Sequence, residues 1–227
     1  MKVKNILLLV LIIALLLIPI KIVPIVIDGH TMYTSAIEEN SIEEKVDQVR
    51  STGMFVKVDE ISDVFLEMLI QSEDQRFYEH NGFDLKSTGR ALLKNIQTGA
   101  KVEGGSSITQ QLAKNLYFTF DKIYERKVAE LFVALQLEKL YEKDEILELY
   151  LNVAYFGNGQ YGIEAASRYY YGVGAFELNQ EQSQELVKTL KSPSLFNPNA
   201  IKEFFHAKVS DLSLSGSNLF LCEYSEN

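Results

Sequence analysis

The N-terminal stretch constrains this chain most strongly. Two lysines near the start precede an apolar run from Ile6 to Ile20, and after Lys21 a second run extends from Ile22 to Ile27. An α-helix needs about 20 apolar residues to cross a bilayer. The stretch reaches that length when Lys21 is included, because a lysine can extend its charge to the membrane surface along its flexible stem. We therefore predict one transmembrane helix within residues 1–27.

A cleaved signal peptide is the alternative, but its apolar region is shorter and ends in a small-x-small cleavage site. No Ala-x-Ala pattern follows the run, which continues as Ile-Val-Pro-Ile-Val-Ile-Asp. The sequence therefore favours an uncleaved anchor. Lys2 and Lys4 at its start predict a cytoplasmic N-terminus. We expect a single-pass protein of the cell membrane with its folded domain on the extracytoplasmic face.

Composition limits what the rest of the chain can be. The 227 residues, 47% of them hydrophobic, are enough for one buried core. The net charge of −9 argues against a nucleic-acid partner, which needs a broad basic face. The single cysteine, Cys222, excludes an intramolecular disulfide and a cysteine-based zinc site. The three histidines, His30, His80 and His206, are scattered and predict no metal-binding cluster.

The sequence pattern indicates a mainly α fold. We interpret residues 28–58 as a polar stalk that holds a short capped helix beginning near Ser41. Residues 59–200 show apolar positions three and four apart, which is typical of amphipathic helices, and few strand signals. We expect seven or eight helices there, including Leu85–Ile96, a helix after Gly105, Tyr124–Tyr141 with a buried stripe at Val128, Leu131, Phe132, Leu135 and Leu137, Lys143–Asn152, Ile163–Tyr171 and Glu181–Leu190.

The stretch from Gly104 to Asn115 has the residue types of a ligand-binding loop and helix start. Its two glycines allow close approach of the backbone to a ligand. Ser107 and Gln110 have the spacing of a capping box that opens a helix. The first turn of such a helix offers free N–H groups and a positive dipole end, which suit an anion. An ordinary glycine loop before a polar helix explains the same residues.

Two further clusters of charged residues are candidates for chemistry. Glu73 and Asp74 end an apolar helix, where partial burial would make one of them a better proton acceptor near neutral pH. A solvated helix end paired with Arg76 is the alternative interpretation. Arg126 and Glu130 are four residues apart and so share a helix face, where they can form an ordinary ion pair.

Four motifs in this order resemble those of the peptidoglycan glycosyltransferases, the polymerising module of class A penicillin-binding proteins (glycosyltransferase family 51). They are Glu73-Asp-x-x-Phe-x-x-His80-x-Gly82, Gly104-Gly-Ser-x-Ile-Thr-Gln-Gln-Leu-x-Lys-Asn115, Arg126-Lys-x-x-Glu130 and Lys143-x-x-Ile-Leu-Glu-x-Tyr-Leu-Asn152. The likeness covers about residues 60 to 200. With no room for a transpeptidase domain, the chain resembles the monofunctional form. The resemblance implies a lysozyme-like helical domain with a smaller membrane-associated jaw subdomain, here residues 85–100.

The resemblance also implies a reaction and the residues that carry it. The family polymerises lipid II into β-1,4-linked glycan strands with inversion at the MurNAc C1 and release of polyprenyl pyrophosphate. Glu73 matches the general base and Glu130 the second essential carboxylate. The residues that match substrate-binding positions are Asp74, Phe77, His80, Gly105, Ser106, Thr109, Gln110, Gln111, Lys114, Asn115, Lys122, Arg126 and Lys127. Among them Lys114, Lys122, Arg126 and Lys127 would support the pyrophosphate.

The implied partners are lipid II, the growing glycan chain, membrane lipid and proteins of a cell-wall synthesis complex. A divalent cation, Mg²⁺ or Mn²⁺, would act together with the substrate pyrophosphate. Glu130 alone is a poor metal site, so any ion would depend on the phosphates.

One departure from the family concerns the C-terminus. The family's fifth motif, an arginine followed by a Val-Leu pair, is missing, and residues 201–227 form a divergent tail without clean periodicity. Two other functions remain open on the sequence. One is a lysozyme-like glycan-cleaving enzyme, which would not need the cluster of cations. The other is a catalytically impaired membrane scaffold of cell-wall synthesis, and the tail is the feature that suggests it.

Overall fold

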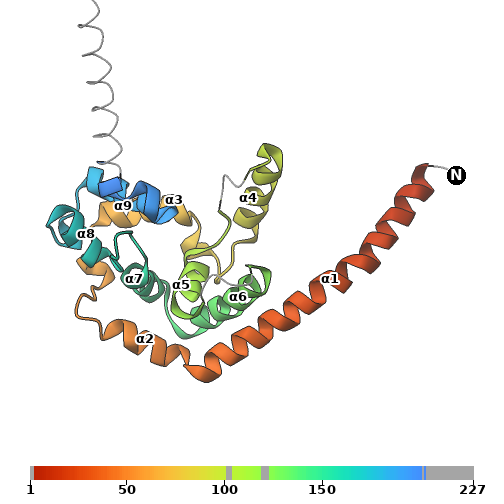
Figure 1. Ribbon diagram of the computed structural model, residues 1–227, viewed down its shortest axis with the longest axis horizontal. Helices are drawn as coiled ribbons and strands as arrows, with labels where there is room; N and C mark the ends of the chain where they lie inside the picture. Colours follow the sequence, from red (N-terminus) through yellow and green to blue (C-terminus); the bar gives the residue numbers. More distant parts are fainter. Residues whose placement is uncertain (1–2, 101–103, 119–122, 201, 203–227) are drawn as a thin grey trace, which may run out of the picture. The chain divides into compact units, whose positions relative to one another are not determined.

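The computed structural model describes residues 3–100, 104–118, 123–200 and 202, with side chains from Leu17 onward except those of Ile18 and Ile123. Within these ranges the fold is mainly α, as predicted, and extended residues pair only at an isolated antiparallel bridge between Tyr155 and Tyr161. The α-helices (Figure 1) are α1 Val3–Glu39, α2 Ile42–Arg50, α3 Asp63–Glu73, α4 Leu85–Thr98, α5 Ile108–Tyr117, α6 Ile123–Leu140, α7 Lys143–Val153, α8 Ile163–Tyr171, α9 Gln180–Lys191 and α10 Pro193–Phe196. Single 3₁₀ turns lie at Val58–Glu60, Phe77–Glu79 and Ala175–Glu177.

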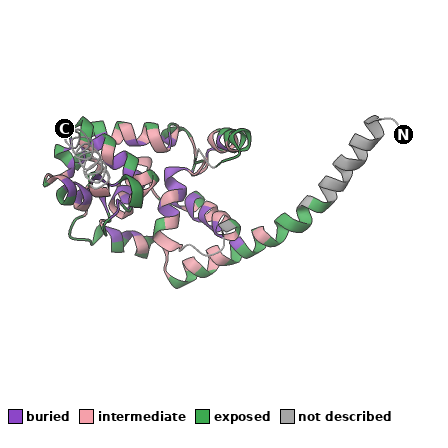
Figure 2. Ribbon diagram, turned by 45° about the horizontal axis from the view of Figure 1, so that its top comes forward, coloured by how far each residue is buried: buried purple, intermediate pink, exposed green. Residues whose placement is uncertain are grey.

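The chain divides into two compact units. The first contains residues up to 53 and residues 73–153, and the second contains residues 54–72 and the described residues from 154 onward. In the first unit α6 packs against both α1 and α5, while α7 packs against α5 and α2. Its core is built from fully buried side chains of three helices (Figure 2), namely Ile108, Leu112, Ala113, Ala129, Val133, Ala134, Leu137, Ile146, Leu147 and Leu149.

The buried stripe of α6 differs from the predicted one. Of the five apolar residues predicted to form it, only Leu137 is fully buried, and Leu135 is exposed. The buried positions are small or charged instead, with Ala129, Glu130 and Val133 among them. Small side chains let a neighbouring helix approach closely. The size of a side chain therefore did not predict which face of α6 lies inward.

Residues 28–58, predicted as a polar stalk, are largely helical and packed. Helix α1 continues to Glu39, and α2 begins after Ser41, whose side chain forms a capping box with Glu44 as expected from their spacing. Helix α2 buries Val46 and Val49. Residues 28–53 of this segment therefore belong to the first unit, whereas residues 54–58 belong to the second.

Helix α1 contacts α6 closely. At Gly29 a Cβ atom would lie 2.6 Å from the Cβ of Val128, so only glycine allows the two helices to come this near. One turn further, the hydroxyl of Tyr33 donates a hydrogen bond of 2.6 Å to Gln136 Oε1. The Tyr33 ring also lies 5.5 Å from the ring of Phe132, measured between centroids. These contacts attach the C-terminal part of α1, the helix that also contains the apolar N-terminal run, to α6.

The predicted anchor, residues 1–27, falls mostly on residues whose side chains lie outside the described set. Among the described residues no helix has the length and apolar character needed to span a bilayer. Except for Lys202, the predicted divergent tail, residues 201–227, also lies outside the described residues.

The second unit is held by polar contacts around its 3₁₀ turn Ala175–Glu177 as well as by apolar burial. The carboxylate of Glu164 on α8 accepts a hydrogen bond of 2.8 Å from the amide of Ala175 and one of 2.6 Å from Arg168 Nε. The hydroxyl of Ser62 donates to the carbonyl of Leu178 at 2.9 Å. These bonds satisfy polar groups that burial would otherwise leave without partners.

Candidate active site

The carboxylate of Glu73, the predicted base, lies at the C-terminal end of α3 and is partly buried. Gln111 on α5 donates from Nε2 to Glu73 Oε2 at 3.2 Å. The other end of the same amide, Oε1, accepts a hydrogen bond of 3.1 Å from the hydroxyl of Tyr150 on α7. Three helices therefore contribute to the position of this carboxylate.

Asp74, the neighbouring carboxylate, is buried and fully engaged with the protein. Its oxygens lie 3.0 and 2.9 Å from His80 Nε2, and one of them accepts a 3.0 Å hydrogen bond from the amide of Ile108. Because a carboxylate only accepts, the His80 ring carries a proton on Nε2. Ile108 is the first residue of α5, whose N–H has no partner within the helix. Asp74 thus connects the end of α3 to the start of α5.

The start of α5 has the predicted capping box. The side chain of Ser107 accepts from the amide of Gln110, and Gln110 Oε1 accepts from the amide of Ser107, both at 3.1 Å. The Ser107 hydroxyl also donates to the carbonyl of Gly82 at 2.6 Å. Gln110, predicted to bind substrate, therefore uses its side-chain oxygen for the helix cap.

Gly105 lies close to α4, so its missing side chain allows packing within the protein. A Cβ atom there would lie 3.1 Å from the Cα of Thr88 on α4, and the Thr88 hydroxyl donates to the carbonyl of Gly105 at 2.8 Å. Gly104, in contrast, has open space where a Cβ would be. Of the two glycines, we infer that Gly104 is the one that leaves the backbone accessible.

Two other predicted substrate-binding residues point into the protein. The Thr109 hydroxyl donates to Glu138 Oε1 at 2.6 Å, and the same oxygen accepts from Lys143 Nζ at 2.8 Å. Phe77 is fully buried, with Lys143 Nζ placed 4.5 Å from its ring centroid. Thr109 and Phe77 therefore support the site by packing and hydrogen bonding.

A cluster of charges surrounds Glu130, the second predicted carboxylate, which is fully buried on α6. Its Oε1 lies 2.5 Å from Arg126 Nη1, and its Oε2 lies 2.6 Å from Lys127 Nζ. Lys127 Nζ also donates to Ser106 Oγ at 3.0 Å. Two cations around one carboxylate leave surplus positive charge beside the loop that opens α5.

Arg76 is not the partner of the carboxylate pair. Its guanidinium instead holds the carboxylate of Asp84, with Nε 3.0 Å from Oδ2 and a second contact from Nη2 to Oδ1. Asp84 caps α4 by accepting from the amide of Ser87 at 3.0 Å. Burial opposes ionisation of Asp84, but the bonds from Ser87 and Arg76 outweigh it and lower its pKa from 3.8 to about 2. The alternative interpretation of Glu73 and Asp74 as a solvated end paired with Arg76 is therefore wrong.

Comparison with known proteins identifies the kind of chain that carries this arrangement. A family model described as transglycosylase matches residues 39–217. The chain belongs to the transglycosylase family.

Individual members of the transglycosylase family agree with this assignment. Penicillin-binding protein 1F of Bacillus subtilis (strain 168) is 49% identical over 143 residues, which cover 63% of this chain and 20% of that protein. The monofunctional glycosyltransferases of Staphylococcus aureus strains JH9 and Newman are each 41% identical over 180 residues, covering 75% of this chain and 66% of theirs. The chain thus spans a fifth of one relative and just under two thirds of the others.

The remaining predicted contacts of this transglycosylase lie on α5 and just after it. Lys114 follows Gln111 by three residues, which places both on one side of the helix, and it is partly buried. Asn115 is exposed. Lys122, predicted to support the pyrophosphate, lies outside the described residues. The structure thus attaches both Glu73 and the Glu130 cluster to the start of α5, through Gln111 and Ser106.

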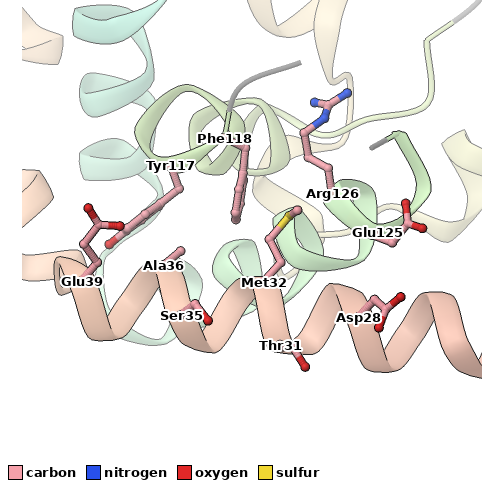
Figure 3. Close-up of a pocket in the computed structure, with 10 residues that line it drawn as sticks. All are labelled: Asp28, Thr31, Met32, Ser35, Ala36, Glu39, Tyr117, Phe118, Glu125 and Arg126. Atoms are coloured by element: carbon pink, nitrogen blue, oxygen red, sulfur yellow. The ribbon is translucent and has the colours of Figure 1, made fainter. Parts of the chain in front are cut away.

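A groove of about 530 Å³ lies beside this cluster in the transglycosylase chain (Figure 3). It runs along α1 and is closed by residues at the end of α5 and the beginning of α6. Arg126 contributes to its wall, but its guanidinium points away from α1, toward its ion pair with Glu130. The lining residues are Asp28, Thr31, Met32, Ser35, Ala36, Glu39, Tyr117, Phe118, Glu125 and Arg126.

The described residues do not fit a resident metal ion. In these parts of the chain no three histidine, cysteine, aspartate or glutamate side chains lie close enough together to hold one. Both oxygens of Glu130 already face cations. A divalent ion needs several oxygen ligands of low or negative charge.

From the sequence, Tyr150 is identified only as one position of the fourth family motif, with no role of its own. Glu138 is not identified at all. Tyr150 occupies a buried position of an amphipathic helix, where a phenol needs a partner for its hydroxyl. That signal could have marked Tyr150 as a residue with a polar role, although not its partner.

Proposed function

We propose that this chain is a peptidoglycan glycosyltransferase that polymerises lipid II. The observation that carries the proposal is the joint attachment of Glu73 and the Arg126–Lys127–Glu130 cluster to the start of α5. One carboxylate is partly buried and held by an amide, as a base requires, and surplus positive charge lies beside the same helix start. The match to the transglycosylase family supports the same reaction.

In this reaction the 4-hydroxyl of the acceptor sugar attacks C1 of the MurNAc unit of the donor. Glu73 takes the proton from that hydroxyl as the O4–C1 bond forms on the face opposite the leaving group. The bond between C1 and the phosphate oxygen breaks, and its electron pair leaves with the polyprenyl pyrophosphate. Inversion at C1 follows from attack on the opposite face.

The leaving pyrophosphate needs positive charge where negative charge develops, and such preorganised groups often make the largest contribution to catalysis. Lys127 is partly exposed, so its ammonium can reach a phosphate. Arg126 is buried, and its place beside Glu130 holds the cluster together. We assign Lys114 and Lys122 to the same phosphate-binding role. Because the described residues offer no preformed metal site, we propose that a divalent ion enters with the substrate's pyrophosphate.

Access to lipid II requires the membrane surface. We propose that residues 1–27 anchor the chain in the bilayer with a cytoplasmic N-terminus, and that the folded part is a lysozyme-like domain outside. Helix α4, in the predicted jaw, supports this arrangement because four apolar side chains on it, Leu85, Leu92, Leu93 and Ile96, are between 60% and 74% exposed. Their spacing places them along one side of the helix. We propose that this side contacts lipid.

Incubation of the full chain with lipid II, followed by separation of the products on a gel, tests the proposal. A ladder of glycan polymers is the expected result. Shortening of an added glycan strand would instead indicate a lysozyme-like cleaving enzyme. Binding of lipid II without any product would indicate the impaired scaffold, and adding a relative's C-terminal helix would then test whether the divergent tail is responsible.

A further inference from the structure

Tyr150 is linked to Glu73, the proposed base, through hydrogen bonds to and from the Gln111 side chain. The residue lies on α7 with only 1% of its surface exposed. Its hydroxyl is 3.1 Å from Gln111 Oε1, and Gln111 Nε2 is 3.2 Å from Glu73 Oε2. The three side chains form a series in which each donor has one acceptor.

The direction of the donors in this series follows from chemistry. An ionised carboxylate can only accept, so Glu73 requires the NH₂ end of the Gln111 amide. The carbonyl end must then face Tyr150, which has to donate. Burial, and secondarily the charge of Glu73, raise the pKa of Tyr150 far above its ordinary value, so the phenol keeps its proton. The direction of both hydrogen bonds is therefore fixed: Tyr150 donates to Gln111, and Gln111 donates to Glu73.

We propose that Tyr150 is a positioning residue for the glycosyl transfer, acting on Glu73 through the Gln111 amide. Without the phenol hydroxyl, the partly buried carbonyl of Gln111 loses its partner within the protein, and the amide can rotate so that its oxygen and nitrogen exchange places. A turned amide would present its oxygen to the carboxylate and repel it. The hydroxyl of Tyr150 thus selects the one amide orientation that holds Glu73 toward the acceptor hydroxyl. This inference rests on the proposed function.

A positioning role and a packing role predict different effects of the same substitution. Tyr150→Phe keeps the ring that packs in the core and removes only the hydroxyl. If the hydroxyl positions the base, the substitution lowers kcat for lipid II polymerisation by about tenfold, the size expected for one hydrogen bond lost in the transition state. KM stays within about twofold of the wild-type value, because ground-state binding is unchanged.

Tyr170→Phe is the matched control, since Tyr170 is also buried and its hydroxyl donates to a backbone carbonyl, that of Phe156, at 2.9 Å. Both variants lose one buried hydroxyl. We expect similar changes in thermal stability and a loss of kcat in Tyr150→Phe alone. Equal kcat values for Tyr150→Phe and the wild type, or an equal loss in both variants, would overturn the proposal.

A double-mutant cycle with Gln111→Met gives a second and independent test. Methionine has a length similar to that of glutamine but no amide, so the connection is already broken. In that background Tyr150→Phe should change kcat by less than about twofold. Independent, multiplying losses would show that Tyr150 does not act through Gln111. If Tyr150→Phe does not fold, Gln111→Met alone must still lower kcat, and a wild-type kcat there would overturn the proposal.

Glu73→Gln, measured in parallel, separates the role of Glu73 as the base from the positioning role of Tyr150. An active Glu73→Gln variant would remove the assignment of Glu73 as the base, on which the role of Tyr150 depends, whereas a wild type that forms no polymer from lipid II would remove the proposed function itself. An inactive Glu73→Gln variant together with an unaffected Tyr150→Phe variant would remove only the role of Tyr150.

Discussion

Gly29 on α1 approaches α6 so closely that a Cβ atom would lie 2.6 Å from the Cβ of Val128 and 2.7 Å from the carbonyl oxygen of Glu125. Helix α6 carries Arg126, Lys127 and Glu130. The C-terminal part of α1, which continues from the apolar N-terminal run, is therefore packed directly on the helix that supplies the cluster of charges. We expect damage to this contact to disturb the proposed phosphate site.

The first prediction concerns glycines in two helices. Gly29→Ala should destabilise the protein by about 1–3 kcal/mol, because the added methyl group meets backbone and side-chain atoms of α6. Gly89→Ala in α4 is the control, since a Cβ there has open space around it. It should stabilise the protein by about 0.5–1 kcal/mol through helix propensity. Thermal unfolding measures both, and changes of the same sign would contradict the packing described for Gly29.

A second prediction concerns the pH dependence contributed by Asp84. Its pKa is about 2 in the folded chain against 3.8 ordinarily, so its stabilising effect is complete above about pH 4 and is lost as the pH falls toward 2. Asp84→Asn keeps an N-cap residue but removes the charge that pairs with Arg76. It should cost on the order of 1–2 kcal/mol at pH 7.

Denaturant unfolding of the wild type and Asp84→Asn across this pH range checks the prediction. The difference in unfolding free energy should shrink between pH 4 and pH 2. Asp84→Ala, which also loses the cap, should be less stable than Asp84→Asn by about 1 kcal/mol at every pH. A difference between wild type and Asp84→Asn that does not change with pH would show that the ion pair with Arg76 contributes nothing.

A third prediction separates the two cations beside Glu130. The Arg126 side chain is 10% exposed and that of Lys127 is 42% exposed. Arg126→Ala leaves Glu130 buried beside one remaining, partly solvated cation, and should cost about 3 kcal/mol or more of stability. Lys127→Ala should cost less than about 1 kcal/mol, because its ion pair is partly solvated.

The effect of Lys127→Ala on activity should be large although its effect on stability is small. Lys127→Ala should lower the rate of lipid II polymerisation by tenfold or more, since it removes a cation assigned to the leaving pyrophosphate. Thermal unfolding and initial rates measured on both variants provide the comparison. A Lys127→Ala variant with wild-type rates would exclude Lys127 from phosphate binding.

A fourth prediction concerns the apolar side of α4. Replacing Leu92 and Leu93 with Gln should weaken association of the folded chain with anionic lipid vesicles, because each buried leucine contributes roughly 1.5–3 kcal/mol. Leu195→Gln, at an exposed apolar position on α10 in the second unit, is the control and should have no effect. Vesicle sedimentation of chains that lack residues 1–27 isolates this contribution from the anchor. Unchanged binding in the double variant would exclude α4 from lipid contact.

The sequence predicted the features that depend on neighbouring residues. The capping box of Ser107 with Gln110 joins residues three apart, so its spacing alone predicted it, and the capped helix that begins after Ser41 was also expected. Helices α3 to α9 also followed from apolar periodicity, because each helix must bury one side, whereas the part of α1 after Asp28 was predicted as a polar stalk.

Contacts between distant residues were beyond this kind of reasoning. Arg76 pairs with Asp84 rather than with Glu73 or Asp74, because the turn after α3 brings the start of α4 to it. Thr109 bonds to Glu138, 29 residues away. Such partners depend on how the helices pack, which local spacing does not encode. The mistaken stripe on α6 has the same origin, since α1, α5 and α7 all contact α6 and its small residues face inward.

The measurement that tests the account most directly is the initial rate of lipid II polymerisation by Glu73→Gln beside the wild type. Glu79→Gln, an exposed site that makes the same chemical change six residues away, is the control and should keep the wild-type rate. Loss of the base should lower the rate of Glu73→Gln by about 10²–10⁴-fold while its thermal stability stays close to that of the wild type. A Glu73→Gln rate within about twofold of the wild-type rate would contradict the assignment of Glu73 as the base.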